Sequence, residues 1–272
     1  MTRTRLAAGY DISRVLKGGW QLAGGHGKVD PSAALADMER FAEAGITTLD
    51  CADIYVGVEE LIGRWLRIRA ATAAAVQVHT KYVPDLDRLQ THSRGDVVRG
   101  VDRSLRRLGV DVLDLVQLHW WDYDALGYID AALWLNELRT AGKIRHVGLT
   151  NFDPQRVAEI VAAGVPVVSQ HKGFVYMYDW LGMKEVAVLE PKPGVEPTVS
   201  HLQGVLAALK SQPARIVVYA GYQDPRSSEW LGKNAGVTAV KLPFTVGGSE
   251  RAKDLFGLFD DTIARLLAAT AR

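Results

Sequence analysis

The sequence contains a single cysteine, Cys51, among its 272 residues. One cysteine cannot form a disulfide within the chain and cannot supply a cysteine-rich metal cluster. No run approaches the roughly 18 apolar residues that cross a bilayer, so we expect no membrane partner. Residues 1–19 include basic side chains but lack the apolar core of a secretory signal. The expected location is therefore the cytoplasm.

The chain also lacks an excess of charge of either sign. It has 32 basic and 31 acidic residues, a formal net charge of +1. Because no basic block stands out, we expect no nucleic-acid partner. Hydrophobic residues make up 48% of the sequence, as in a globular protein with a sizeable core. The length allows one large α/β barrel or two smaller domains.

What is present is an alternation of short β-branched runs with amphipathic segments of helical period. Nine runs are predicted to be strands, and they begin near Val15, Thr47, Val76, Leu113, His146, Pro166, Glu185, Arg215 and Thr238. Residues 31–45, 94–109 and 127–142 are among the predicted helices, and each ends on a glycine that can cap it. This alternation predicts right-handed βαβ units and a mostly parallel sheet.

The spacing of polar residues at the strand ends changes along the chain. Asp50, Lys81, His119 and Asn151 follow one another at intervals of about one βα unit, as in a (β/α)8 barrel. The intervals shorten from Gln170 onwards, and nine strands exceed what an eight-stranded barrel holds. We therefore expect an α/β fold: a partial or complete (β/α)8 TIM-type barrel, continued by further parallel α/β units. The sequence leaves open whether the later strands close the barrel or form a separate sheet.

Residues 12 to about 168 resemble the aldo-keto reductase family. The resemblance is carried by five motifs in barrel order: GGWQL (18–22), TTLDCADIYVGVEELIG (47–63), VHTKY (78–82), LDLVQLHWW (113–121) and GKIRHVGLTNF (142–152). It implies an oxidoreductase that reduces a small-molecule carbonyl with NADPH or NADH.

The resemblance also implies a catalytic tetrad at Asp50, Tyr55, Lys81 and His119. A carbonyl that accepts hydride develops negative charge on its oxygen and needs a proton donor there. Tyr55 would be that donor, because an ammonium such as Lys81 nearby favours loss of a phenol's proton. Asp50 would hold Lys81 in place, and His119 would orient the carbonyl. Any one of these residues alone would more simply be a solvated strand-end side chain.

Cofactor and substrate contacts follow from the same resemblance. Thr150 and Asn151 would bind the carboxamide of the nicotinamide ring. Trp20, Trp120 and Tyr82 would line the substrate pocket.

Residues from about 166 to 270 resemble a different family: they are similar to the C-terminal lobe of zinc/manganese ABC-transporter substrate-binding proteins. The carriers are HKGFVYMYDWLG (171–182), LEPKPGVEPTVSHL (189–202), YQDPRSSEWL (222–231), LPFTVGG (242–248) and AKDLFGLFDDTIARLL (252–267). The predicted organisation is a reductase-like portion at 1–168 joined to a binding-protein-like portion at 169–272. Since no linker separates them, the chain is predicted to be a chimera.

The binding-protein-like portion at 169–272 weakens the case for a metal-binding function and also the case for a reductase function. His171 matches a metal ligand of the binding proteins, but one imidazole cannot hold zinc, so it is a weak candidate and no metal site is predicted. The usual cofactor-phosphate loops of the reductases are absent. Residues 247–253 place a glycine-rich loop before a helix, which can bind an anion, although a structural loop is the simpler interpretation.

Three functions therefore remain open. The first is a carbonyl reductase, impaired if its cofactor is poorly held. The second is a fold chimera, engineered or generated, without evolved activity, and the third is a metal-binding module. An incomplete barrel would also expose strand edges through which the chain could self-associate.

Overall fold

The computed structural model describes residues 3–25, 27–69, 75–192 and 194–270. The chain forms two compact units, Met1–Phe152 and Asp153–Arg272. Each is described by itself below, as unit 1 and unit 2.

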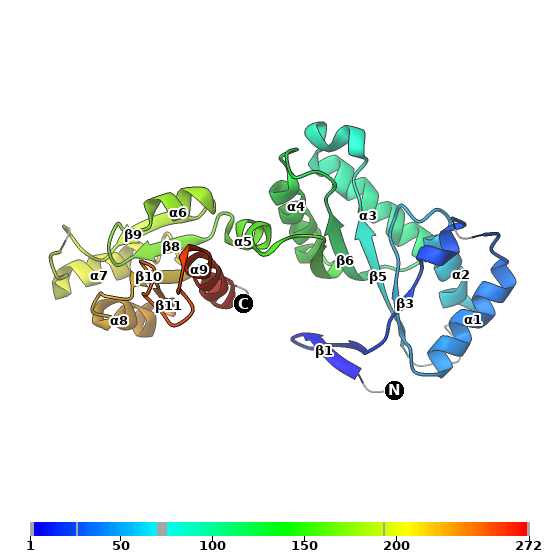
Figure 1. Cartoon of the computed structure of the whole chain (residues 1–272), viewed down its shortest axis with the longest axis horizontal. Coiled ribbons are helices and arrows are strands. Elements are labelled where there is room, and N and C mark those ends of the chain that lie inside the picture. Colours follow the sequence, from blue (N-terminus) through cyan, green and yellow to red (C-terminus); the bar gives the residue numbers. More distant parts are fainter. Residues whose placement is uncertain (1–2, 26, 70–74, 193, 271–272) are drawn as a thin grey trace. The chain divides into compact units, whose positions relative to one another are not determined.

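Unit 1 contains a five-stranded parallel sheet whose spatial order follows the chain (Figure 1). Its strands are β3 (Lys17–Gly18), β4 (Thr48–Asp50), β5 (Gln77–Tyr82), β6 (Leu113–His119) and β7 (Ile144–Thr150). Successive strands that are hydrogen-bonded neighbours, each reached through a helix, are the first five βα steps of a barrel. This is the part of the chain for which the sequence predicted barrel spacing.

The helices of unit 1 begin and end where local capping dictates. They are α1 (Pro31–Glu43), α2 (Val58–Arg69), α3 (Arg94–Leu108) and α4 (Tyr128–Thr140), with short 3-10 turns η1 (Trp20–Ala23) and η2 (Leu86–Thr91). Asp30 caps α1 by accepting from the Ser32 amide, and Ser93 with Asp96 forms a capping box on α3. Gly109, at φ 68°, ends α3 in the left-handed conformation that glycine adopts without strain.

An antiparallel hairpin, β1 (Arg3–Ala7) paired with β2 (Tyr10–Ser13), precedes the sheet. The Ser13 amide donates to Thr48 Oγ1 at 3.1 Å, which ties the hairpin to the start of β4. The sequence analysis did not predict it, because β1 is exposed along its whole length and lacks an apolar alternation.

A cavity of about 410 Å³ lies between this hairpin and one face of the sheet. Asp50, His79 and Gln117 are among its lining residues. In a closed barrel such side chains would pack against those of the remaining strands. In unit 1 residues of the hairpin, among them Tyr10 and Ile12, line this cavity together with the sheet.

Unit 2 contains a four-stranded parallel sheet of order β11-β10-β8-β9 (Figure 1). Its strands are β8 (Pro166–Ser169), β9 (Lys184–Val188), β10 (Ile216–Ala220) and β11 (Thr238–Leu242). Its helices are α5 (Pro154–Ala162), α6 (Val175–Trp180), α7 (Val199–Ala208), α8 (Arg226–Ala235) and α9 (Leu255–Thr270).

The central strands of unit 2 are buried on both faces. Val167 belongs to a core cluster with α5, α6 and α9, whereas its neighbour Val168 belongs to a second cluster with α7 and α8. Val217 and Val218 of β10 divide between the two clusters in the same way. A strand that is covered on both faces needs apolar side chains at every position. This explains the unbroken apolar runs in the sequence patterns VPVVS and IVVY.

All nine predicted strands are found among the described residues, and the predicted α/β class with parallel sheets is confirmed. Among the described residues, the last four predicted strands form the sheet of unit 2 and the first five form the sheet of unit 1. Whether the later strands complete the barrel stays a prediction.

Candidate active site

The carboxyl ends of four neighbouring strands in unit 1 carry the predicted polar residues. Asp50 ends β4, Lys81 lies one residue before the end of β5, and His119 ends β6. In the register of the sheet, Lys81 lies opposite Gln117, and His119 lies opposite Thr150 of β7. Since this edge is where (β/α)8 enzymes hold their catalytic groups, the structure places these residues where such a site is expected.

Lys81 is the most tightly held side chain at this edge. Its Nζ lies 2.9 and 2.7 Å from the two carboxylate oxygens of Asp50 and donates to the Cys51 carbonyl at 2.9 Å. Only 12% of the Lys81 side chain is exposed. Gln117 Nε2 lies 3.3 Å from Asp50 Oδ1, a contact that the sequence analysis missed. These acceptors fix the position of the ammonium group.

Tyr55 lies in the short turn that follows β4, beside this ammonium. Lys81 Nζ is 5.7 Å from the centroid of the Tyr55 ring. On its other side the Tyr55 ring meets Trp20 edge to face, with centroids 5.0 Å apart. The structure therefore brings together Asp50, Lys81, Tyr55 and Trp20, and the half-exposed Trp20 ring is available to contact a substrate.

The turn that carries Tyr55 is anchored by two arginines of α3. Arg107 Nη1 donates to the Asp53 carbonyl at 2.9 Å and lies 3.2 Å from Glu59 Oε2. Arg103 Nη2 lies 3.0 Å from Asp53 Oδ2, while Asp53 Oδ1 accepts from the Val83 amide. Burial is the main cause that raises the pKa of Asp53 to about 7. This network was not predicted, because its members are far apart in the sequence.

His119 is half-buried at the end of β6, next to Trp121. The two ring centroids are 4.6 Å apart. Burial, and then repulsion from the Lys81 ammonium, lower the pKa of His119 below its ordinary value. The ring is therefore neutral at neutral pH, and a neutral imidazole still donates one hydrogen bond.

Trp120 and Tyr82, expected to line the substrate pocket, are both buried, and their place in the pocket wall stays a prediction. They are 1% and 5% exposed. Trp120 Nε1 donates to the Ala125 carbonyl at 2.9 Å, and the Tyr82 ring packs against Gly100 of α3. Side chains alternate between the two faces of a strand, so the residues directly after His119 and Lys81 face the helices. Trp121 is the tryptophan beside His119.

Thr150 and Asn151 lie where β7 ends. Asn151 has φ 65°, the one non-glycine residue with positive φ in the part of the chain that the structure describes. Its carbonyl accepts from the Tyr123 hydroxyl at 2.8 Å. Asparagine tolerates the left-handed region better than most residues. The turn presents Thr150 next to His119 at the same edge.

The glycine-rich loop at 247–253, considered above as an anion site, uses its donors internally. The amides of Gly247 and Gly248 donate to the carbonyls of Ala252 and Thr245 at 2.6 and 2.9 Å. The Ser249 hydroxyl donates to Asp261 Oδ2 at 2.6 Å. A structural loop is therefore the better interpretation. The loop therefore offers neither of these two amides to the phosphates of a dinucleotide cofactor.

His171, the weak metal candidate, pairs with Glu190 in unit 2, and His171 Nδ1 lies 2.8 Å from Glu190 Oε2. Zinc takes four ligands, of which at least three come from the protein. Within the described ranges, no three His, Cys, Asp or Glu side chains are placed to hold a metal ion. The geometry gives no support to the metal-binding alternative.

No helix of the described residues is long and apolar enough to cross a membrane.

The five parallel strands of unit 1 and the helices between them correspond to the first part of a (β/α)8-type fold. The sequence model of the Aldo/keto reductase family matches residues 14–186, more than half of the chain. The chain belongs to the aldo/keto reductase family.

Curated relatives match this reductase portion. The aldo-keto reductase YhdN of Bacillus subtilis is 31% identical over 155 residues, which are 55% of this chain and 46% of the relative. A 6-dehydroglucose reductase of Novosphingobium aromaticivorans is 33% identical over 56% of this chain and 52% of its own length. The chain spans about half the length of these relatives.

Among solved structures, a Bombyx mori aldo-keto reductase in complex with NADP aligns with a TM-score of 0.50 and 20% identity. The alignment covers 99% of this chain and 92% of that one. At this identity the likeness concerns the fold alone.

A second family model, of the zinc-uptake complex component A, periplasmic, matches residues 149–269. It overlaps the reductase match between residues 149 and 186. Both predicted resemblances are thereby confirmed, and they meet inside the chain as a chimera requires. The structural units part between Phe152 and Asp153, whereas the portion boundary predicted at 168/169 stays a prediction.

Proposed function

We propose that unit 1 is the catalytic part of an NADPH-dependent carbonyl reductase in which Tyr55 is the proton donor. One observation supports this most strongly. Lys81 Nζ, held by both oxygens of Asp50, lies 5.7 Å from the centroid of the Tyr55 ring. A fixed positive charge beside a phenol stabilises the phenolate that remains after proton donation.

The reaction balances with these residues. The carbonyl carbon would accept the hydride that NADPH would supply when bound, while the C=O π bond breaks. The Tyr55 phenol gives its proton to the carbonyl oxygen, so the products are an alcohol and oxidised cofactor. Solvent then returns a proton to Tyr55. Lys81 offsets the negative charge of the phenolate in the interval, and Asp50 keeps the ammonium in place.

His119 and Trp20 would position the carbonyl. A neutral His119 donates a hydrogen bond to the carbonyl oxygen, which fixes the oxygen near the Tyr55 hydroxyl and stabilises the charge that develops on it. The Trp20 ring, edge to face with Tyr55, supplies an apolar wall. Thr150 and Asn151 would bind the nicotinamide carboxamide, with NADH as the alternative cofactor.

The substrate class is a small aldehyde or ketone. The name of the Novosphingobium aromaticivorans relative, 6-dehydroglucose reductase, makes a sugar-derived carbonyl the first to be tried.

The decisive experiment measures NADPH and NADH consumption by the purified full chain with a panel of aldehydes, ketones and oxidised sugars. We expect saturable turnover with at least one carbonyl, faster with NADPH than with NADH. If no carbonyl stimulates cofactor oxidation, and NADPH at millimolar concentration leaves tryptophan fluorescence unchanged, the chain is a fold chimera without this activity.

Self-association through the strand edges is a further part of the proposal, and the cytoplasm stays the predicted location. β3 and β7 end one sheet, and β9 and β11 end the other. Edge strands carry unpaired backbone groups that can pair with another chain. Light scattering coupled to size exclusion would give a mass above 29.8 kDa if the edges pair.

A further inference from the structure

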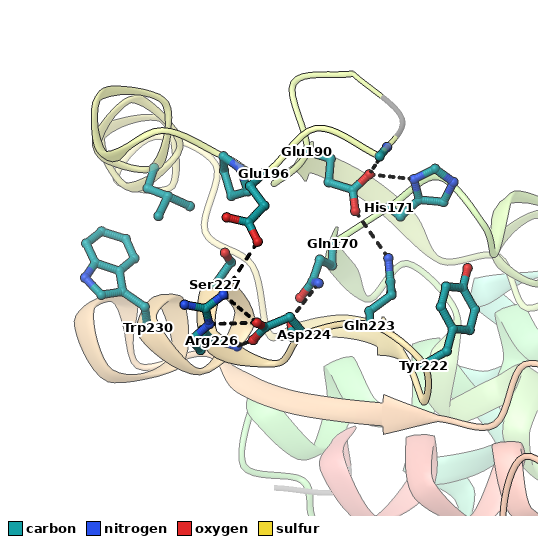
Figure 2. A pocket seen from close by; sticks show the side chains of 13 residues that line it. Gln170, His171, Glu190, Glu196, Tyr222, Gln223, Asp224, Arg226, Ser227 and Trp230 are labelled. Atoms are coloured by element: carbon teal, nitrogen blue, oxygen red, sulfur yellow. Dashed lines mark hydrogen bonds and ion pairs between the residues drawn. The ribbon is translucent and has the colours of Figure 1, made fainter.

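A second site lies in unit 2, in a cavity of about 550 Å³ at the carboxyl ends of its strands (Figure 2). Gln170 and His171 enter it from the loop after β8, and Tyr222 and Gln223 enter it from the loop after β10. After β8 the chain runs to α6 on one face of the sheet, and after β10 it runs to α8 on the other. Open α/β sheets bind ligands in the crevice where neighbouring connections part in this way. The volume is that of a small-molecule site, about 300–1,000 Å³.

One side of the cavity is organised around Glu190. Its carboxylate, with 14% of the side chain exposed, accepts from His171 Nδ1 at 2.8 Å and from the Gly194 amide at 2.9 Å. Gln223 Nε2 lies 3.4 Å from the other oxygen. Because a carboxylate can only accept, His171 Nδ1 is the donor in this contact. His171 Nε2 makes no hydrogen bond within the described residues.

The opposite side is organised around Arg226, as Figure 2 shows. Its Nε and Nη2 lie 2.7 and 2.6 Å from Asp224 Oδ2, and Nη2 lies 3.5 Å from Glu196. The buried Gln170 side chain donates to the Asp224 carbonyl at 2.8 Å and accepts from Ser228 Oγ at 2.7 Å. These contacts hold both sides of the cavity in place before a ligand arrives.

The charges of the lining exclude several ligand classes. Three carboxylates (Glu190, Glu196 and Asp224) outnumber one guanidinium and one imidazole, which disfavours phosphates and other anions. A zinc ion would find the His171–Glu190 pair and, among the described residues, no third ligand placed with it. An alkylammonium would bring donors only, and would leave the donors of the cavity unmatched.

Those donors come from aromatic and hydroxyl side chains. Tyr222, Ser227 and Trp230 line the cavity, and their side-chain donors make no hydrogen bond among the described residues. The Tyr222 side chain is exposed, with its ring against Phe244. The lining therefore combines acceptors, donors and aromatic rings. A ligand that matches it must donate and accept at several points and also present apolar surface.

We propose that this cavity binds a neutral, hydroxyl-rich small molecule of the monosaccharide or polyol class. Each hydroxyl both donates and accepts a hydrogen bond, so neighbouring hydroxyls can give protons to Glu190 and accept from Arg226 or Tyr222. The C–H surfaces of such a molecule pack on the Trp230 and Tyr222 rings. The site is independent of the reductase function proposed for unit 1.

Isothermal titration calorimetry of the full chain tests this with glucose, galactose, xylose and sorbitol as probes, and with inorganic phosphate and zinc chloride for comparison. We expect saturable heat with at least one sugar or polyol and none with phosphate. Glu190→Gln, of matched volume, should weaken binding at least tenfold. Tyr222→Phe should weaken it severalfold, whereas Tyr176→Phe, an exposed tyrosine on α6, should leave it unchanged.

Circular dichroism of each variant establishes that unit 2 is folded, and Tyr222→Phe serves if Glu190→Gln is not. The absence of saturable heat with all four sugars and polyols at millimolar concentration would overturn the proposal. Zinc heat that His171→Ala abolishes, or phosphate heat, without any response to sugars would overturn it in favour of a metal or an anion site.

Discussion

Units 1 and 2 place polar side chains at the same structural position, the carboxyl ends of parallel strands, but they use them differently. In unit 1 the Lys81 ammonium is enclosed by Asp50 and a backbone carbonyl and directed beside one phenol. In unit 2 Glu190 and Arg226 hold two sides of an open cavity whose donors and acceptors remain available. A concentrated charge beside an acid suits proton transfer, and a dispersed set of hydrogen-bonding groups suits binding. The same strand-end position thus supports different chemistry.

The largest effect that this comparison predicts is on catalysis in unit 1. Tyr55→Phe removes the proposed acid and should lower kcat by about 10²–10⁴-fold, the usual contribution of a positioned proton donor. Tyr176→Phe in unit 2 is the matched control and should retain full activity. Steady-state rates of NADPH oxidation compare the two, and equal rates in wild type and Tyr55→Phe would assign the proton to another group.

The next effect is on stability. Lys81→Met leaves Asp50 without its ion-pair partner and should reduce the free energy of unfolding of unit 1 by about 2 kcal/mol, between the values of exposed and buried pairs. Arg226→Met breaks a fully exposed pair in unit 2 and should leave stability nearly unchanged. Urea denaturation followed by tryptophan fluorescence and circular dichroism measures both. Equal losses would contradict the difference drawn between the units.

A further effect is a pH dependence of unit 1 that centres on Asp53. Burial raises the pKa of Asp53 to about 7, above its ordinary value near 4, so the folded state binds the proton more tightly than the unfolded state. The resulting contribution is complete below about pH 4 and is lost as the pH rises through about 7. The free energy of unfolding of Asp53→Asn should therefore lack this loss as the pH rises.

Chemical denaturation of wild type and Asp53→Asn at intervals from pH 4 to 8 measures the difference. Histidines with lowered pKa values, such as His79, produce an opposite slope in both proteins, which cancels in the comparison. Parallel stability curves for the two proteins would show that Asp53 is not the titrating group.

A last pair of effects concerns two glycines. A Cβ at Gly100 of α3 would lie 2.4 Å from the Tyr82 ring, so Gly100→Ala should destabilise unit 1 by about 1–3 kcal/mol. A Cβ at Gly204 of α7 meets nothing within 4 Å, so Gly204→Ala should stabilise unit 2 by about 0.5–1 kcal/mol through helix propensity. Thermal melting checks both signs.

The sequence predicted what local patterns determine. The strand-end positions of Asp50, Lys81 and His119 followed from barrel spacing, and the structure brings Lys81 beside both Asp50 and Tyr55. Barrel closure depends on pairing between distant strands and could not be derived locally. The Asp53–Arg103–Arg107 network could not be derived either, because its residues are far apart in the sequence. A sequence pattern also does not show which charged groups are buried.

The central claim is that unit 1 directs hydride and proton onto a carbonyl group, and isotope transfer tests it most directly. The full chain would be incubated with NADPH deuterated at both C4 positions and with the best carbonyl substrate of the panel. The account predicts one deuterium on the former carbonyl carbon of the alcohol, seen by mass spectrometry, and a Tyr55→Phe variant that forms little product. Alcohol without deuterium at that carbon, or labelled alcohol formed equally well by Tyr55→Phe, would contradict it.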